Sequence, residues 1–400
     1  MSNSDNFDAR PAWTLVLGLG VMMSISFGLT LNAFSIFTLP IMEAFRCNHE
    51  QAARLATVFM VSMTLVMPAA GWLLDRVPPR PVMVCSCLIT GLAYLAASQS
   101  SSLDMFTMAI ACCGIGVGGS TYVPALILVS RWFPVQRQGL AFGMLLAVVG
   151  AGGTVLPMLL TQMLAQIGLR ATMEAGAVML LAVCIPLLWW LVRLPAHAVP
   201  AAKTQAQEPG IGAMLRLPQY WLWIAMLLLI TISGLSVLMG LVPYLVSIGY
   251  SAAEAAIVYG AIAAATIGGS LLFGALSTRQ GVRRTLSLGV VVGCIGVLAL
   301  LKATETDWGT TALIGFVLSW GMTFNLVNQM SPTLLMEFAG RQNFGSLLGV
   351  GNMISGLGAA MGPTLFGYLV DSSQGYGLPL SLCAALMALA LLPLAMLRQA

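Results

Sequence analysis

The chain has 400 residues, of which 59% are hydrophobic and only 8% are charged. An ordinary soluble domain has roughly 45–50% apolar and about 25% charged residues, so this chain cannot cover itself with polar surface. Its net charge of +4 comes from basic residues that occur singly or in pairs. Because the chain has no long basic run, we do not expect nucleic acid as a partner. The partner we expect is the lipid bilayer.

The apolar residues form blocks of roughly 20 to 28, which at 1.5 Å per residue are long enough to cross a hydrocarbon core of about 30 Å. The first block begins at Trp13 and is too long to be the core of a signal peptide. We therefore predict an all-α membrane protein with twelve transmembrane helices in two sets of six. The expected spans lie near 13–40, 52–74, 81–99, 103–130, 138–164, 172–193, 220–247, 253–276, 285–302, 308–335, 343–370 and 377–397.

The longest connection, at about 194–219, separates the sixth span from the seventh. It contains four prolines around a polar stretch from Lys203 to Glu208, a composition typical of a flexible linker. The predicted organisation is an N-terminal six-helix bundle over 1–193, a linker over 194–219 and a C-terminal six-helix bundle over 220–400.

The basic residues are distributed unequally between alternate loops. Thirteen of the seventeen Lys and Arg residues fall in the set that includes both termini and the linker, and four fall in the other set. Because basic residues near span ends are retained in the cytoplasm, we expect both termini and the linker to be cytoplasmic. The expected location is the cytoplasmic (inner) membrane of a bacterium.

The residues that usually carry metal, redox or catalytic chemistry are poorly placed for it. Seven of the eight cysteines lie inside apolar blocks, where we interpret them as small core residues, and Cys47 has no partner in its loop. The only histidines, His49 and His197, both lie in loops. The glycine clusters in the fourth and fifth spans have no preceding strand and no following Lys-Ser/Thr, so they do not predict a nucleotide site. We expect no metal, no cofactor and no enzyme activity.

A short pattern recurs at the end of the second and eighth spans. Its four residues reappear displaced by 203 positions, about half the chain: Gly71, Leu73, Arg76 and Arg80 correspond to Gly274, Leu276, Arg279 and Arg283. The repeat indicates a duplicated six-helix unit. Parallel halves of this kind are one architecture of secondary transporters, with the substrate site between the halves near the midplane.

Two stretches resemble a known family. Residues 71–80, Gly-Trp-Leu-Leu-Asp-Arg-Val-Pro-Pro-Arg, resemble the loop signature that follows the second span in the major facilitator superfamily, with Pro78 in place of the usual glycine. Arg131-Trp-Phe-Pro134, continuing through Arg137, Gly139, Ala141 and Gly143, resembles the monocarboxylate and oxalate:formate branch, as does Gly168-Leu-Arg-Ala171. The resemblance implies two pseudo-symmetric six-helix bundles that work by alternating access.

The loop signature also predicts a contact between helices that controls the conformation. Gly71 permits two helices to approach closely, and Asp75 is expected to meet a basic side chain and the positive N-terminal end of another helix. The partners we expect are Arg131 and the start of the eleventh span near Asn343. Arg76 and Arg80 complete this candidate conformational latch.

One observation limits that prediction, and an alternative interpretation remains. Thr278 occupies the position of Asp75 in the second copy, so the two copies cannot make the same contact. The alternative is that Asp75 and Arg76 simply end a helix in water.

By resemblance, the first, fourth, seventh and tenth spans line a central cavity. Polar side chains are costly in lipid unless they face a partner or a wet cavity, so those in these spans are candidates for contact with the substrate. The candidates are Asn32, Thr121, Tyr122, Ser233, Ser236, Tyr244, Trp320, Asn325, Asn328 and Gln329. For each of them, hydrogen bonding between helices is the alternative.

Every Lys, Arg, Asp and Glu can be assigned to a loop or a span end, including Glu43, Glu254 and Glu337. In the branch that the chain resembles, an arginine in the eighth span and, in oxalate exchangers, a lysine in the eleventh hold the anion. Ser270 and Gly351 stand at these places. This departure favours recognition by neutral groups and transport without a proton-carrying carboxylate at the bilayer centre.

The predicted function is secondary active or facilitative transport of a small organic solute by a monomer. Three alternatives remain open from the sequence. They are transport or exchange of monocarboxylates and other organic anions, efflux of amphipathic compounds, and a non-transporting sensor with the same fold.

Overall fold

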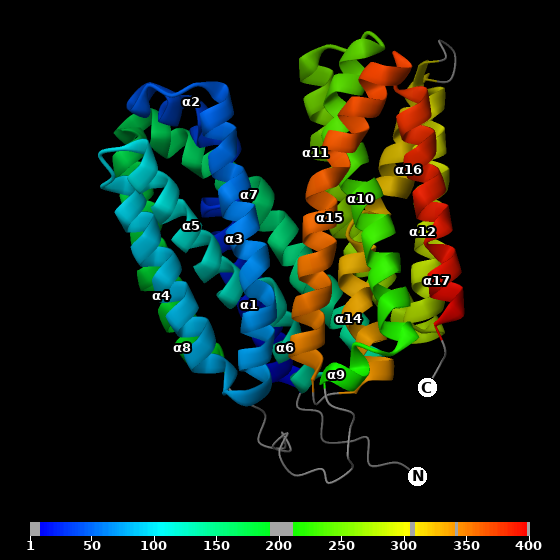
Figure 1. Cartoon of the computed structure of the whole chain (residues 1–400), viewed down its shortest axis with the longest axis horizontal. Helices are drawn as coiled ribbons and strands as arrows, with labels where there is room; N and C mark the ends of the chain where they lie inside the picture. The colour runs from blue at the N-terminus through cyan, green and yellow to red at the C-terminus, as the bar shows by residue number, and fades with distance from the viewer. Residues whose placement is uncertain (1–8, 193–210, 305–308, 341–342, 398–400) are drawn as a thin grey trace. The chain divides into compact units, whose positions relative to one another are not determined.

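The computed structural model describes residues 9–192, 211–304, 309–340 and 343–397. Most of the predicted linker over 194–219 lies outside these residues. Within them, every regular element is a helix, and Figure 1 shows the helices coloured in chain order.

The first half of the chain contains α1 (Ala9–Leu29), α2 (Phe34–Phe45), α3 (His49–Arg76), α4 (Pro79–Ser98), α5 (Leu103–Ser120), α6 (Tyr122–Trp132), α7 (Val135–Met179), the π-helical turn η1 (Leu180–Cys184) and α8 (Ile185–Leu191). The second half contains α9 (Ile211–Met214), α10 (Pro218–Ser247), α11 (Ala252–Gln280), α12 (Val282–Leu300), the 3₁₀ turn η2 (Leu301–Thr304), α13 (Gly309–Phe316), the π-helical turn η3 (Val317–Gly321), α14 (Leu326–Ala339), α15 (Phe344–Ser373), α16 (Gly377–Leu389) and α17 (Leu391–Met396).

Eleven helical stretches in the described residues are long and apolar enough to cross a membrane. One of them, Val135–Leu191, has 57 residues, more than twice the length that a span needs. It turns at Gly168, whose φ of 76° and ψ of 175° are not helical. The described residues therefore hold twelve crossings, and the predicted all-α membrane fold is confirmed.

Three of these crossings are interrupted beside a threonine, a feature that the sequence did not predict. The breaks fall between α1 and α2, at Thr121 between α5 and α6, and between η3 and α14. A threonine lies at each break and donates a hydrogen bond to a carbonyl of the preceding turn: Thr30 to Ser26 at 2.5 Å, Thr121 to Val117 at 2.7 Å and Thr323 to Ser319 at 3.1 Å. Bonds of this kind compete with the backbone ladder and bend helices.

Contacts along the chain divide it into two compact units. Unit 1 comprises Met1–Pro134, Val148–Ala206 and Gln342–Met353, and unit 2 comprises Val135–Ala147, Gln207–Arg341 and Ile354–Ala400. The first thirteen residues of α7 thus group with unit 2, and the first turns of α15 group with unit 1. Apart from these two segments, unit 1 comes from the first half of the chain and unit 2 from the second half.

In unit 1, side chains bind backbone groups both between helices and at a helix start. The Tyr94 hydroxyl, on α4, donates to the carbonyl of Leu29 at the end of α1, at 2.6 Å. The side chain of Asn48 and that of Gln51 form a reciprocal capping box at the start of α3. The cap satisfies backbone N–H groups that the first turn of a helix leaves without partners.

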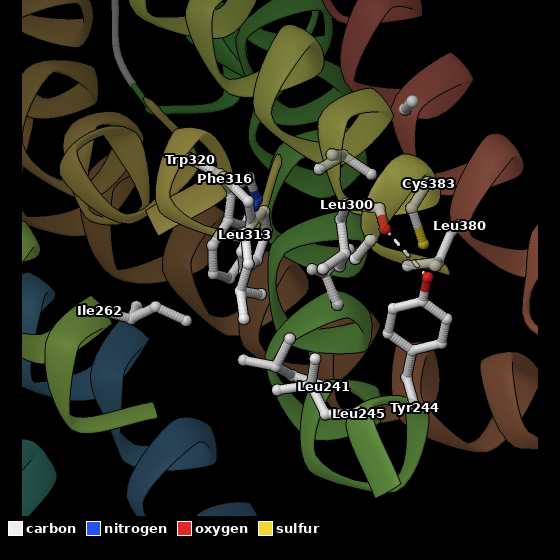
Figure 2. Close-up of a cluster of buried hydrophobic side chains, with 14 of the residues drawn as sticks. Leu241, Tyr244, Leu245, Ile262, Leu300, Leu313, Phe316, Trp320, Leu380 and Cys383 are labelled. Atoms are coloured by element: carbon white, nitrogen blue, oxygen red, sulfur yellow. Dashed lines mark hydrogen bonds between the residues drawn. The ribbon is translucent and has the colours of Figure 1, made fainter. Parts of the chain in front are cut away.

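The core of unit 2 is an apolar cluster between α10, α12, α13, η3 and α16 (Figure 2). Trp320 is 1% exposed and its ring stacks on that of Phe316, with centroids 5.1 Å apart. Tyr244 donates to the carbonyl of Leu300 at 2.9 Å, which ties α10 to α12. Because lipid is as apolar as these side chains, close packing and such hydrogen bonds are what hold the helices together.

An arginine closes each unit in the same way. The Arg80 side chain at the start of α4 donates from Nε to the carbonyl of Val192, at 2.8 Å. The Arg283 side chain at the start of α12 donates to the carbonyl of Ala395. Both partners of the second bond are displaced by 203 residues from those of the first. The predicted duplication therefore extends from the sequence pattern to a contact in the folded chain.

Candidate functional site

The carboxylate of Asp75 lies against the first turn of α15, inside unit 1. Its Oδ1 accepts a hydrogen bond from the backbone N–H of Gly345 at 2.9 Å. Its Oδ2 accepts one from the N–H of Ser346 at 2.8 Å and one from the Ser346 hydroxyl at 2.6 Å. The first N–H groups of a helix have no partner within the helix and carry partial positive charge, so a carboxylate is well suited to this place.

Small residues bring α3 and α15 close enough for these bonds to form. A methyl group added to Gly71 would collide with the carbonyl of Gly345, and one added to Gly349 would collide with the carbonyl of Met67. The two backbones are thus in direct contact, as small residues at helix interfaces permit in membranes. The first turn of α15 is one of the two partners that the sequence predicted for Asp75.

The three arginines of the candidate latch bind groups other than the carboxylate oxygens. Arg131 donates from Nη2 to the carbonyl of Leu74, next to Asp75, at 2.7 Å, and its charge interacts with that of Asp75. The guanidinium of Arg76 lies 4.0 Å from the ring centroid of Trp72. Arg80 binds Val192, as described above. Arg131 therefore holds the end of α3 in place and contributes charge to the Asp75 site.

Unit 2 contains an equivalent pair of helices that is held differently. Its members are α11 and the first turns of α7, where a methyl group on Gly143 would collide with the carbonyl of Ser270. Thr278, at the position equivalent to Asp75, is exposed and donates to the carbonyl of Ala275 in its own helix. The bonds between helices come instead from Gln329 of α14, whose Nε2 donates to Gly139 at 2.8 Å and to Ser270 at 2.9 Å.

Three predicted cavity residues are amides beside the breaks in the spans. Asn32 lies in the break between α1 and α2, and Asn325 lies in the break before α14. All three side chains, including that of Asn328, are partly exposed. Asn328 donates from Nδ2 to Oδ1 of Asn325 at 3.1 Å, so this pair presents a joined donor and acceptor surface. A carbon added to Gly153 of α7 would lie 3.4 Å from Nδ2 of Asn32, so the missing side chain leaves space there.

Most of the other predicted cavity residues bind or pack against other groups of the protein. Ser233 donates to the carbonyl of Cys383 at 2.8 Å, and Ser236 donates to that of Ile232 at 2.7 Å. Thr121 and Tyr244 donate to the backbone, and Trp320 lies in the unit 2 core, as described above. Gln329 is 0% exposed. Ser233, Tyr244 and Gln329 thus make the bonds between helices that formed the alternative in the sequence. Ser236 and Thr121 bond to the preceding turn of their own helices. Tyr122 is partly exposed beside the break at Thr121.

A cavity of about 690 Å³ opens within unit 2 and includes one predicted residue, Tyr244. Its wall also contains Ser247, Asp371, Gln374 and Tyr376. Sequence reasoning missed the last three because they lie in the polar connection between the eleventh and twelfth spans. The sequence of this connection indicates only a loop, because it does not show the contact with the end of α10.

Charged side chains in the described residues lie near helix ends or near the turn at Gly168. Glu254 accepts from the backbone N–H and the hydroxyl of Ser251 at 2.8 Å each, which caps the start of α11. Glu43 lies in the last turn of α2 and Glu337 in the last turn of α14, and both are exposed. In the described part of the chain, no three His, Cys, Asp or Glu residues are grouped so that they could hold a metal ion.

Ser270 and Gly351 stand at the two positions where the resembled branch has basic residues, and both are buried. Ser270 is 3% exposed, and its carbonyl accepts the hydrogen bond from Gln329. Gly351 is buried within α15. Neither position offers a cation to a solute.

Comparison with known proteins was consistent across sequence and structure. The family model described as Major Facilitator Superfamily matches residues 15–363. The chain is 25% identical over 362 residues to the MFS-type transporter YhjX of Escherichia coli K12, which covers 88% of this chain and 86% of that protein. It is 25% identical over 381 residues to monocarboxylate transporter 13 of Bos taurus, covering 92% and 85% of the two chains.

Two further matches extend this result. The oxalate:formate antiporter of Oxalobacter formigenes is 28% identical over 337 residues, covering 79% of this chain and 77% of that protein. The crystal structure of the Escherichia coli fucose:proton symporter FucP superposes with a TM-score of 0.78 at 13% identity, covering 97% of this chain and 98% of that chain.

Proposed function

Because the chain belongs to the major facilitator superfamily, it is a transmembrane transporter of small solutes, and we propose that it recognises its solute through neutral hydrogen-bonding side chains. The observation that carries this proposal is the pair formed by Asn325 and Asn328. The pair is partly exposed and lies at an interruption of the tenth span. Interrupted helices are where transporters of several folds bind their substrates, because the backbone there tolerates polar neighbours.

Within unit 1, Asn32 is a separate amide at the break of the first span. An amide offers both a donor and an acceptor and carries no charge, so it suits hydroxyl, carbonyl and amide groups of a solute. Ser270 and Gly351 place no cation in the eighth and eleventh spans. These observations favour a neutral organic solute carried by facilitated diffusion or exchange.

Transport of an organic anion is the second candidate, because two relatives bear the names monocarboxylate transporter 13 and oxalate:formate antiporter. An anion held by amides alone would lack the charge-assisted bonds that basic side chains supply. We therefore expect weak binding if the solute is a carboxylate.

The conformational cycle involves the contact between α3 and α15. The three hydrogen bonds to Asp75 stabilise the state in which the two helices touch, and alternating access requires that this contact opens. We propose that Gly71, Asp75 and Arg131 form the latch of this state. Arg76 and Arg80 hold neighbouring segments.

The remaining features of the proposal follow from the sequence. The chain works as a monomer made of two six-helix bundles, over 1–193 and 220–400, joined by the linker. Both termini and the linker face the cytoplasm of a bacterial cell, as the unequal distribution of basic residues indicates. The function is transport and no enzymatic step is involved.

The experiment that tests the proposal begins with a thermal-stabilisation screen of the purified protein against neutral and anionic organic solutes. A ligand that binds only the folded state stabilises it by about 2.7 kcal/mol when present at a hundred times its Kd. Each stabilising solute is then tested for counterflow in proteoliposomes. Counterflow of a neutral solute, lost in Asn325→Ala, is the expected result. Counterflow restricted to carboxylates would establish the second candidate, and binding without flux would indicate a sensor.

A further inference from the structure

Gln329 makes an unusual set of contacts for a polar side chain in a transmembrane helix. It projects from α14, is 0% exposed, and donates both of its amide hydrogens to backbone carbonyls of two other helices, Gly139 of α7 and Ser270 of α11. One side chain thus joins three helices. A side chain with these contacts has no free donor to offer to a solute.

The contact has a counterpart in unit 1. Gly345 and Gly349 of α15 lie against Gly71 and Met67 of α3, and Gly139 and Gly143 of α7 lie in the same way near Gly274 and Ser270 of α11. Gly71 and Met67 are displaced by 203 residues from Gly274 and Ser270. The duplicated helix pairs are therefore equivalent in packing and differ in what holds them.

In unit 1 the bond is between a carboxylate and a helix N-terminus, whereas in unit 2 it is between a neutral amide and two carbonyls. Thr278 cannot supply the missing carboxylate, and Gln329 reaches the pair from the third helix. The amide therefore takes the role that the charge has in the first copy.

The face of α14 that carries Gln329 also holds polar groups whose burial is unfavourable. Oε1 of Gln329 and Oγ1 of Thr333, one turn further along α14, are both buried and have no hydrogen-bond partner among the described residues. A buried polar atom without a partner costs about 1–3 kcal/mol. Separation of the helices would let water reach both atoms, so the contact combines two favourable bonds with two unfavourable burials and is suited to opening.

We propose that Gln329 is a positioning residue for transport: it fastens the first turns of α7 to α11 and α14, and the breaking of its two bonds is a step of the conformational change. The inference rests on transport by alternating access. The role of these bonds in the conformational change is inferred from the course of α7, which continues after Ala147 into unit 1. The two bonds of Gln329 therefore act on a helix whose residues are shared between the two units.

The test uses a reporter cysteine at Ser277, in a chain whose native cysteines other than Cys383 are replaced. Ser277 is 4% exposed, and a methyl group on Gly139 would collide with its hydroxyl, so the side chain becomes accessible only when α7 separates from α11. The rate of labelling of Ser277→Cys by N-ethylmaleimide is measured without any solute. Cys383, 5% exposed in the core of the same unit, reports general unfolding in the same sample.

The variant Gln329→Glu keeps the shape of the side chain and replaces the donor with an oxygen that the two carbonyls repel. We expect labelling at position 277 to rise at least about tenfold, the factor for 1.4 kcal/mol, with Cys383 unchanged. Gln51→Glu is the matched control, because its Oε1 accepts a bond at the exposed start of α3 and tolerates charge. It should leave both rates unchanged.

Thr333→Val gives an independent result in the opposite direction and keeps the shape of the residue. It removes a buried hydroxyl that has no partner, so the closed contact becomes more stable and labelling at position 277 should fall several-fold. The proposal is overturned if folded Gln329→Glu labels at the unaltered rate, if positions 277 and 383 respond equally, or if Thr333→Val does not slow labelling. None of these outcomes depends on the solute, so the proposal can fail while transport through Asn325 and Asn328 stands.

Discussion

Asp75 and Ser346 are joined by two hydrogen bonds although 271 residues separate them in the sequence. One bond comes from the backbone of Ser346 and the other from its hydroxyl. The same carboxylate also accepts from the N–H of Gly345. The end of α3 and the start of α15 are therefore held by a charged group that the sequence identifies from its loop motif.

Asp75→Asn should weaken this contact without abolishing it. The amide keeps one acceptor oxygen but loses the charge that interacts with the helix N-terminus and with Arg131. The site is partly exposed, so we expect a loss on the order of 1 kcal/mol, a fivefold shift of a balanced equilibrium. The accessibility of a cysteine placed in the first turn of α15 measures the shift. Thr278→Ala is the control and should change accessibility much less; an unaltered rate in Asp75→Asn would refute the latch.

Gly345→Ala should prevent the close approach altogether. The added methyl would lie 2.7 Å from Oδ1 of Asp75 and 2.5 Å from the carbonyl oxygen of Gly71, which belongs to the backbone and cannot rotate away. Overpacking of this kind costs about 1–3 kcal/mol. Gly367→Ala makes the same change in α15 where nothing lies within 4 Å, and should leave the melting temperature unchanged or slightly raised. Equal melting temperatures for the two variants would contradict the close contact.

Asn325→Ala and Asn328→Ala should each weaken solute binding. Removal of one partner of a polar contact costs about 0.5–1.5 kcal/mol, or up to roughly tenfold in Kd. The measurement is the thermal shift produced by the solute that the screen identifies. Ser372→Ala, at an exposed hydroxyl that bonds only within α15, is the control. Wild-type affinity in both asparagine variants would place the binding site elsewhere.

Transport should not depend on an imposed pH gradient. A carboxylate that couples protons to conformational change must be buried, since burial favours its protonated form. Glu254 caps α11, and Glu43 and Glu337 are exposed at helix ends, so glutamine at each position should preserve the flux. The measurement is uptake into proteoliposomes with and without the gradient. Uphill accumulation that collapses with the gradient, and that one of these substitutions abolishes, would show that a glutamate carries the proton.

The segment that contains Lys203 should be labelled only from the cytoplasmic side. The prediction follows from the thirteen-to-four distribution of basic residues between alternate loops. A cysteine introduced at Lys203 and treated with an impermeant maleimide in intact cells should stay unlabelled until the membrane is permeabilised. Labelling in intact cells would reverse the proposed topology.

The sequence predicted the fold well because length and hydrophobicity determine it. Each crossing needs about 20 apolar residues, so the blocks could be counted, and the loop motif at Gly71 and its copy at Gly274 revealed the duplication. The helix breaks were missed because they depend on whether a threonine such as Thr121 bonds to its own helix. The sequence of an apolar block does not show whether that bond forms.

The candidate site was harder to predict for a related reason. A polar side chain in a span is satisfied either by another helix or by the solute, and the residue type alone does not distinguish the two. Gln329 was therefore grouped with Asn325 and Asn328, although its amide binds two carbonyls. Asp75 was easier, because a charged group at a helix end has few possible partners.

The two arginine bonds, from Arg80 to Val192 and from Arg283 to Ala395, bear on the ancestry of the chain. A contact present in both copies, with the same separation between donor and acceptor, is what descent of both copies from one ancestral unit predicts. The ancestor thus already joined the loop after its second helix to the end of its sixth. The carboxylate of Asp75 and the amide of Gln329 differ between the copies, so this divergence dates from after the duplication.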